Sequence, residues 1–326
     1  MRFRELFREV NRKTVEIRVP SFEEMLQLED VPAGIRKHRA EIVQEKRKRF
    51  GEAENLPPGV YRFHIGRSPL HSIEWIPSPN YSNRPDARID LLVFHYTVTS
   101  TLDSTVKWFQ NTQSRVSAHY VIGKDGRIVQ MVKDEKKAWH AGVSFWQGES
   151  GCNAFSIGIE MVNEGESKGI PYTPEQYEAA IYLGKLLVEK YSIPARRVVG
   201  HSDIAPYRKI DPGKHFNWSL LAQNGIGFLP TPSPNGPNMY YGGYVLRRGD
   251  NDRRGIYGGK PQRPDQYVRQ LQSHLRTIGY YISIDGDFGP KTEDVVEAFQ
   301  RHFLPENITG RVDANTARMI HQFHLN

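Results

Sequence analysis

Two short apolar runs that each lead into a histidine constrain this chain most strongly. The first covers residues 89–95 and closes on His95, and the second covers residues 197–200 and is followed at once by His201. Runs of this length are typical of buried strands, and the ends of such strands gather in one region of an α/β sheet. Asp211 lies in a turn a short distance beyond the second run. We therefore expect these three side chains to meet at one edge of a sheet.

Two imidazoles and a carboxylate are a typical three-ligand set for zinc, with the fourth position left open. A closed structural site would more often recruit cysteines, and the chain has a single cysteine, Cys152. An open position is what a hydrolytic metal ion needs for water or substrate. The set of His95, His201 and Asp211 therefore predicts a zinc enzyme.

A second interpretation of the same region stays open from the residues alone. His201-Ser202-Asp203, taken with His95, has the composition of the facial triad of iron oxygenases. The all-β pattern expected for that chemistry is missing, which disfavours this interpretation. The chain also contains 12 histidines, and a single histidine at a strand end is more often structural than a ligand.

Length and composition indicate a soluble globular protein of two or three domains. The chain has 326 residues, of which 38% are hydrophobic and 25% are charged. No apolar stretch reaches the roughly 18 residues of a membrane span, and the N-terminus lacks the apolar core and cleavage site of a secretory signal. The compartment is left open, because a cytoplasmic enzyme, a phage-released enzyme and a protein exported by another route all fit.

The basic charge is concentrated near the N-terminus. The formal net charge is +7, and residues 1–50 hold 13 Lys/Arg against 9 Asp/Glu, an excess of four. A basic surface suits an anionic partner such as nucleic acid, membrane or cell-wall polymer, although a solvated helical face is the simpler interpretation. No nucleic-acid-binding motif accompanies the charge, so we expect no nucleic-acid partner.

Changes in composition divide the chain into four segments. Residues 1–60 predict a basic helical extension, residues 61–228 alternate strand and helix signals, residues 229–264 are rich in proline and glycine, and residues 265–326 predict a compact helical unit. The predicted fold class is α/β, with a mixed central sheet flanked by helices. A linker and a small C-terminal domain follow it.

Two local signals define elements of the α/β segment. Residues 118–122 and 128–132 flank an Asp-Gly turn, which predicts a hairpin. Thr173 is followed by a proline and then by Gln176, the pattern of a capping box at the start of a helix. We expect the apolar stripe of this helix to begin at Tyr177 and to recur every three or four residues.

Residues 86–217 resemble the zinc-dependent N-acetylmuramoyl-L-alanine amidases, and more distantly phage amidases and peptidoglycan recognition proteins. The match runs through six blocks in the same order, and no single block would suffice. The blocks are residues 93–97, 117–122, 138–142, 153–160, 200–206 and 209–213. The resemblance implies the amidase fold. It also implies hydrolysis of the amide between N-acetylmuramic acid and the L-Ala of a peptidoglycan stem peptide.

Carried over to this sequence, the resemblance makes His95, His201 and Asp211 the ligands of a zinc ion. It makes Glu160 the catalytic carboxylate and Lys209 a second catalytic group. The chemistry agrees, because a carboxyl group in a dry pocket has a raised pKa and suits a general base, and a fixed cation stabilises an oxyanion. Without the resemblance, an outward-facing strand residue is the less favoured alternative for Glu160, and a surface lysine explains Lys209 equally well.

Three further residues of the matched blocks are expected near the pocket. We predict that Trp139, His140 and Asn153 contact substrate. His140 is assigned to the pocket wall and not to the metal, because a fourth protein ligand would close the site. A structural role fits His140 equally well, and packing alone would explain Trp139.

The C-terminal segment resembles the small three-helix peptidoglycan-binding domain. The resemblance is carried by a distinctive Asp-Gly-x-Phe-Gly-Pro-x-Thr string at residues 285–292, and Tyr280 and Tyr281 precede it. These two rings could stack on sugar faces or fill the core. A binding domain joined to a hydrolase raises the effective concentration of substrate, so we expect peptidoglycan or large muropeptides as the partner. A non-catalytic peptidoglycan-binding sensor is the alternative function.

Overall fold

The structure is a computed structural model. It describes residues 15–18, 60–63, 72–230, 240–261 and 266–323. The chain divides into two compact units, Met1–Pro69 and Leu70–Asn326, and each is described by itself. Among the described residues, no helix has the length and apolarity needed to cross a membrane.

The described residues of the first unit correct the prediction of a purely helical extension. Strand β1 (Val15–Arg18) pairs antiparallel with β2 (Val60–Phe63). Valine and isoleucine alternate with charged residues along β1, which is the period-two pattern of a strand. The other helices predicted within residues 1–60 lie outside the described residues.

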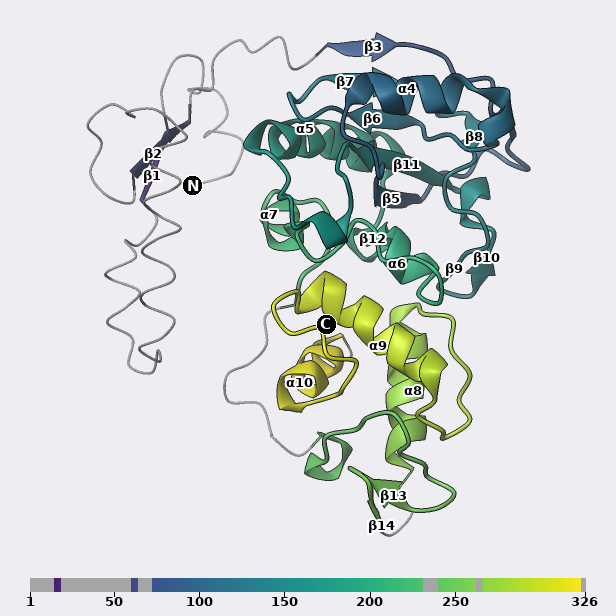
Figure 1. The fold of residues 1–326 in the computed structure, drawn as a ribbon, viewed down its shortest axis with the longest axis vertical. Helices are drawn as coiled ribbons and strands as arrows, with labels where there is room; N and C mark the ends of the chain where they lie inside the picture. The colour runs from purple at the N-terminus through teal and green to yellow at the C-terminus, as the bar shows by residue number, and fades with distance from the viewer. Residues whose placement is uncertain (1–14, 19–59, 64–71, 231–239, 262–265, 324–326) are drawn as a thin grey trace. The chain divides into compact units, whose positions relative to one another are not determined.

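The second unit is built on a mixed six-stranded sheet, which confirms the predicted fold class (Figure 1). The strand order is β12-β5-β11-β6-β7-β3, and the strands on either side of β5 run parallel to it. The hairpin predicted around the Asp-Gly turn is the antiparallel pair β6 and β7. The strand bounds are β3 Ile73–Trp75, β5 Leu91–Tyr96, β6 Tyr120–Ile122, β7 Ile128–Gln130, β11 Ser156–Met161 and β12 Val198–Gly200.

Helices cover both faces of this sheet, and additional short strands pair with each other outside it. The helices of the α/β region are α4 Leu102–Gln110, α5 Pro174–Tyr191, α6 His201–Ile204 and α7 Trp218–Gln223. Two small antiparallel pairs lie outside the main sheet. They are β4 Tyr81–Asn83 with β8 Lys136–Ala138, and β9 Phe145–Trp146 with β10 Glu149–Ser150.

Helix α5 begins as its sequence predicts. The Thr173 hydroxyl accepts the backbone N–H of Gln176 at 3.1 Å, and the Gln176 side chain accepts the Thr173 N–H at 3.1 Å. The buried stripe overlaps the predicted one at Ala180 and Gly184, but it is centred toward Ala179, Leu183 and Leu187, and Tyr177 packs at the edge of the core. The helix is apolar over a wide arc, so spacing alone did not fix which side faces the sheet.

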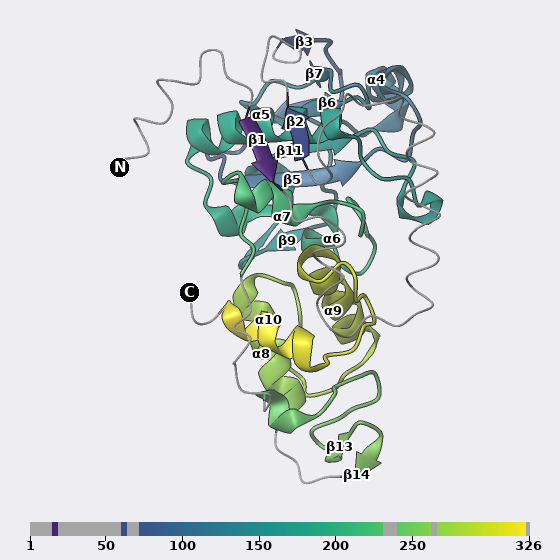
Figure 2. The same ribbon diagram turned by 90° about the vertical axis from the view of Figure 1, so that its left-hand side faces the viewer.

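The C-terminal region confirms the predicted three-helix domain (Figure 2). Its helices are α8 Tyr267–Ile278, α9 Pro290–Phe303 and α10 Ala314–Gln322. Residues 240–261, which lie within the predicted linker, pack into the same core. Leu246 is fully buried and forms a bridge with Val312, and Tyr257 is buried as well. This stretch ends in the hairpin of β13 (Ile256–Tyr257) and β14 (Lys260–Pro261).

Strand β5 contributes to two of the three hydrophobic cores that the described residues of the second unit form. Its alternating side chains point to opposite faces of the sheet. Leu92 and Phe94 belong to the core that contains α5, whereas Leu91 and Val93 belong to a core that continues into the C-terminal helices. The strand is therefore buried on both faces up to His95, and its last residues reach the edge where polar side chains gather.

Candidate metal centre

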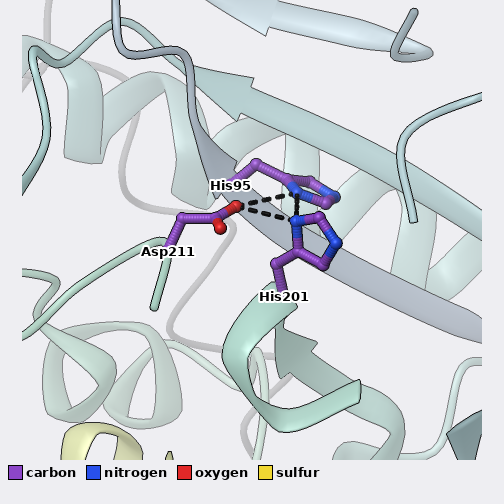
Figure 3. Close-up of side chains that lie close together, drawn as sticks. All are labelled: His95, His201 and Asp211. Carbon is purple, nitrogen blue, oxygen red and sulfur yellow. Dashed lines mark hydrogen bonds and ion pairs between the residues drawn. The ribbon is translucent and has the colours of Figure 1, made fainter. Parts of the chain in front are cut away.

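The three side chains predicted from the apolar runs meet at the carboxyl edge of the sheet (Figure 3). The Nδ1 atoms of His95 and His201 lie 2.9 Å apart, and Oδ2 of Asp211 lies 3.1 Å from the first and 3.0 Å from the second. All three side chains are buried. Among the described residues, this is the one group of three or more potential ligands that comes together in this way.

Separate elements bring the three side chains to this point. His95 lies in β5, and His201 opens α6 directly after β12. The loop that carries Asp211 is held by the backbone, since Ser202 N–H donates to the Asp211 carbonyl at 2.8 Å. The Tyr172 hydroxyl donates to the Pro212 carbonyl at 2.8 Å and fixes the same loop from the other side.

The far sides of the two imidazoles determine which nitrogen faces the centre. His201 Nε2 lies 3.1 Å from the Ala141 carbonyl, which can only accept a hydrogen bond. His95 Nε2 lies 3.0 Å from Nδ1 of His140, whose own Nε2 lies 3.1 Å from the Ser156 hydroxyl. In the tautomers in which both Nε2 atoms donate outward, the two Nδ1 lone pairs face each other and the Asp211 carboxylate. A cation between them removes that repulsion.

The electrostatics of the cluster favour the protonation states that a metal ion requires. Burial, and then the neighbouring His201, lower the pKa of His95 to about 4, so this imidazole is neutral at pH 7. Burial on its own would raise the pKa of Asp211, but His201 and His95 outweigh it and hold that pKa well below its usual value. Ligand atoms of a tetrahedral zinc ion lie about 3.3 Å apart, close to the spacing found here. The donor set therefore fits zinc.

Glu160 stands next to the ligand set. It lies on β11 directly beside His95 in the parallel register. Its Oε2 atom is buried and accepts no hydrogen bond from the described residues. Burial, with a contribution from Asp211, raises the pKa of Glu160 to about 8, and Lys209 opposes this rise. A carboxyl group in this environment exchanges a proton near neutral pH.

Glu160 and Lys209 line a common pocket with two of the ligands. The pocket has a volume of about 350 Å³ and contains His201 and Asp211 in its wall. Its remaining wall is largely aromatic and aliphatic, with Trp108 half exposed. The structure thus brings together the five residues to which the resemblance gives metal-binding and catalytic roles.

The three predicted substrate contacts fall in different places. Trp139 lines the pocket, and its indole N–H donates to the Ser82 hydroxyl at 3.2 Å. His140 also reaches the pocket wall, although it is mostly buried behind His95. Asn153 does not line this pocket. Its side-chain oxygen instead accepts the backbone N–H groups of His140 and Ala141, at 3.1 and 2.8 Å.

Comparisons with known proteins agree with this geometry. The family described as N-acetylmuramoyl-L-alanine amidase matches residues 85–214, and the peptidoglycan-binding domain family matches residues 264–320. The N-acetylmuramoyl-L-alanine amidase AmiD of Escherichia coli is 36% identical over 244 residues, which cover 70% of this chain and 80% of that protein. This chain belongs to the N-acetylmuramoyl-L-alanine amidase family.

Relatives of the amidase with solved structures share its fold. AmiD from E. coli, in complex with anhydro-N-acetylmuramic acid-L-Ala-D-gamma-Glu-L-Lys, is 32% identical over 80% of this chain and 93% of that chain, with a TM-score of 0.58. AmpDh3 from Pseudomonas aeruginosa is 31% identical over 75% of this chain and 94% of that chain, with a TM-score of 0.59. The amidase is therefore a hydrolase that acts on peptidoglycan.

The structure of the amidase contradicts the iron-oxygenase interpretation. Asp203 does not face His95 or the metal-binding cluster. Its carboxylate accepts three hydrogen bonds, all at 2.7 Å, from the Gly200 N–H, the Tyr280 hydroxyl and the His302 ring. Asp203 is fully buried, and each of its two carboxylate oxygens accepts at least one of these hydrogen bonds. The His-x-Asp pattern places its two polar residues in different clusters.

Sequence reasoning missed two residues that support the amidase centre. Arg208 lines the pocket, donates to the Ala141 and Val143 carbonyls, and lies 3.3 Å from His201 Nε2. No sequence signal marks it, because it acts through backbone groups of a distant loop. Gly158 leaves room for His140, since a Cβ atom there would stand 2.5 Å from the imidazole ring. A lone glycine inside an apolar strand is a recognised sign of such close approach.

Proposed function

We propose that this amidase holds zinc with His95, His201 and Asp211 and cleaves the N-acetylmuramoyl–L-alanine amide with Glu160 as its proton carrier. The observation that carries the proposal is the placement of the Glu160 carboxyl group, whose Oε2 atom is buried without a hydrogen-bond partner among the described residues, beside two converging Nδ1 atoms and a carboxylate oxygen. A zinc ion held by these donors would act as a Lewis acid on the scissile carbonyl. It would also lower the pKa of a bound water molecule to about 7.

The remaining roles belong to side chains of the chain itself. Glu160 accepts the proton of the attacking water and delivers it to the nitrogen of the leaving L-Ala. Lys209, in the wall of the same pocket, places a positive charge near the oxygen on which negative charge develops. Trp139 and the aliphatic wall exclude bulk water, which strengthens both effects.

We further propose that the amidase acts on polymeric peptidoglycan or large fragments. The C-terminal domain shares a hydrophobic core with the catalytic region, so it stands in a fixed place beside the pocket. A fixed binding surface next to a catalytic site favours a long substrate that reaches both.

The test is a digestion of purified peptidoglycan with and without a zinc chelator. We expect free stem peptides with an N-terminal Ala, release that stops with chelator, and recovery on addition of zinc. A Glu160→Ala variant should retain its zinc and lose at least about 100-fold in rate. Absence of release from the wild-type protein would leave a peptidoglycan-binding protein without activity, and unchanged release from Glu160→Ala would refute the role of Glu160.

A further inference from the structure

The C-terminal domain is fastened to the catalytic region by buried contacts, so surfaces formed between them are fixed. Asp203 of α6 accepts hydrogen bonds from Tyr280 and His302 of the C-terminal domain, and all three side chains are buried. The His302 ring also stacks on Trp218 with centroids 3.8 Å apart. Arg301 pairs with Glu166 at 3.3 Å, and both side chains are largely buried.

The segment that follows α8 forms one wall of the contact between the C-terminal domain and the catalytic region. The Gln147 N–H donates to the Gly279 carbonyl at 3.0 Å, which joins this segment to the β9–β10 hairpin. Gly279 has φ +144°, and a Cβ atom there would lie 2.9 Å from the ring of Trp146. Trp146 in turn packs edge-on against Tyr280, with centroids 5.2 Å apart. The close approach that Gly279 allows therefore sets the position of Tyr280, and with it that of Tyr281, the residue after it.

Tyr281 and the catalytic region enclose a groove of about 710 Å³. Tyr281 is 59% exposed and Val143, opposite it in the lining, is 89% exposed. Phe145 packs against Tyr281 with ring centroids 5.0 Å apart, and the Tyr207 hydroxyl donates to the Tyr281 carbonyl. The groove is thus lined by aromatic rings from both domains, with serine hydroxyls and backbone groups between them.

The groove shares one wall residue with the metal pocket and carries almost no free charge. Arg208 lines both cavities. It is the one charged residue in the lining of the groove, and its guanidinium donates to the Ala141 and Val143 carbonyls. A stem peptide with glutamyl carboxylates would require free cations here. A neutral sugar requires apolar ring faces with hydroxyl and carbonyl groups at their edges, which is what the groove offers.

We propose that this groove is a subsite for the N-acetylated glycan strand of peptidoglycan, shared by the two domains, with Tyr281 as its stacking platform. The assignment of the glycan to peptidoglycan rests on the proposed function. The strand would enter the groove from one side of the muramic acid whose lactyl amide lies in the metal pocket. The C-terminal domain thereby completes a binding site and does not act only as a tether.

The first experiment titrates chitotetraose into the full-length protein and follows binding by NMR. We expect Tyr281→Ala to weaken binding at least about fivefold, the size expected for the loss of one aromatic stack. Tyr281→Phe, which keeps the ring, should bind like the wild type. Tyr81→Ala is the matched control, because Tyr81 is similarly exposed at 45% and does not line the groove. Unchanged binding by Tyr281→Ala, or equal loss in the control, would overturn the proposal.

The second experiment compares two substrates for cleavage. Tyr281→Ala should raise KM on insoluble peptidoglycan severalfold and leave kcat/KM unchanged on a single muramoyl tripeptide. An equal loss on the tripeptide would assign the groove to the stem peptide and refute the glycan subsite. The titration requires no turnover, so a protein that binds chitotetraose through Tyr281 and cleaves neither substrate would refute the proposed function while leaving the subsite standing.

Discussion

Helix α6 contributes to two clusters of histidine and aspartate that differ in how their polar atoms are satisfied. In one, Nδ1 of His201 and Nδ1 of His95 face each other and the carboxylate of Asp211. In the other, the carboxylate of Asp203 accepts hydrogen bonds from a backbone amide, a tyrosine and a histidine. The first cluster could hold a metal ion, whereas both oxygens of the second carboxylate already have donors from the protein.

This difference separates the proposed metal-binding cluster from a hydrogen-bonded cluster of similar composition. Both are buried, and both contain a His–Asp contact of 3.0 Å or less. What distinguishes them is the set of groups at the carboxylate: Oδ2 of Asp211 faces two imidazole nitrogens, whereas Asp203 accepts from a backbone N–H and a tyrosine hydroxyl as well as from His302. Buried carboxylates with all their donors provided by the protein contribute to stability and orientation rather than to chemistry.

The largest expected effect is at the cluster of His95, His201 and Asp211. His201→Ala should lose its bound zinc and about 1,000-fold or more in activity, because the metal contributes several kcal/mol to the transition state. The measurement is zinc content by mass spectrometry together with the rate of stem-peptide release. A His201→Ala protein that keeps one zinc per chain and its activity would show that the ion is held elsewhere.

Asp203→Asn tests the hydrogen-bonded cluster. We expect full zinc content but a free energy of unfolding lower by about 2–4 kcal/mol, because an amide cannot accept all three donors at a buried site. Chemical denaturation measures the change. Tyr280→Phe removes a single donor and should cost less, about 1–2 kcal/mol. Loss of zinc from Asp203→Asn with unchanged stability would reverse the roles assigned to the two clusters.

Gly158→Ala tests how the metal-binding cluster is supported. The new methyl group would displace the His140 ring, and with it the partner of His95 Nε2. Loss of such a supporting contact to a metal ligand costs about 10–100-fold in metal affinity or activity. Gly289→Ala is the control, since a Cβ atom there meets nothing within 4 Å. Equal zinc affinity in the two variants would contradict the role of His140.

The smallest effect is a pH dependence of stability from His119, a histidine outside both clusters. Burial, and then Arg84, lower the pKa of His119 to about 3 from 6.5. On acidification the unfolded state therefore binds a proton near pH 6.5, whereas the folded state does not. The contribution of neutral His119 to the free energy of unfolding is present above pH 6.5 and is lost as the pH falls toward 3. Between pH 7 and pH 5.5 it amounts to about 1 kcal/mol.

Unfolding experiments at the two pH values measure this effect. His119→Gln should show a smaller decrease in stability on acidification than the wild type. The same pH dependence in both proteins would mean that His119 is not the group responsible.

The sequence predicted the convergence of His95, His201 and Asp211 better than it predicted the contacts of Asp203, for a physical reason. His95 and His201 end apolar runs, and the ends of parallel strands must converge, so local pattern carried the spatial information. The hydrogen-bond donors of Asp203, Tyr280 and His302, lie about 80 and 100 positions further along the chain. No periodicity predicts a contact between domains, and the His-x-Asp spacing therefore suggested a metal ligand where the fold forms a hydrogen-bonding node.

The same limit applies to the aromatic pair after α8. From sequence, Tyr280 and Tyr281 could each fill the core or face a ligand. The structure divides them, since Tyr280 is fully buried and Tyr281 is 59% exposed. The docking of Gly279 against Trp146 decides which ring turns inward. Asn153 is a related case, because its amide holds a backbone turn and does not reach the pocket.

Anomalous scattering at the zinc edge, measured on crystals of the protein as purified, tests the central distinction most directly. The account predicts a single strong peak about 2.0–2.2 Å from Nδ1 of His95, Nδ1 of His201 and a carboxylate oxygen of Asp211. It also predicts no peak at Asp203. A protein without zinc at the first cluster, or with zinc bound to Asp203, would contradict it.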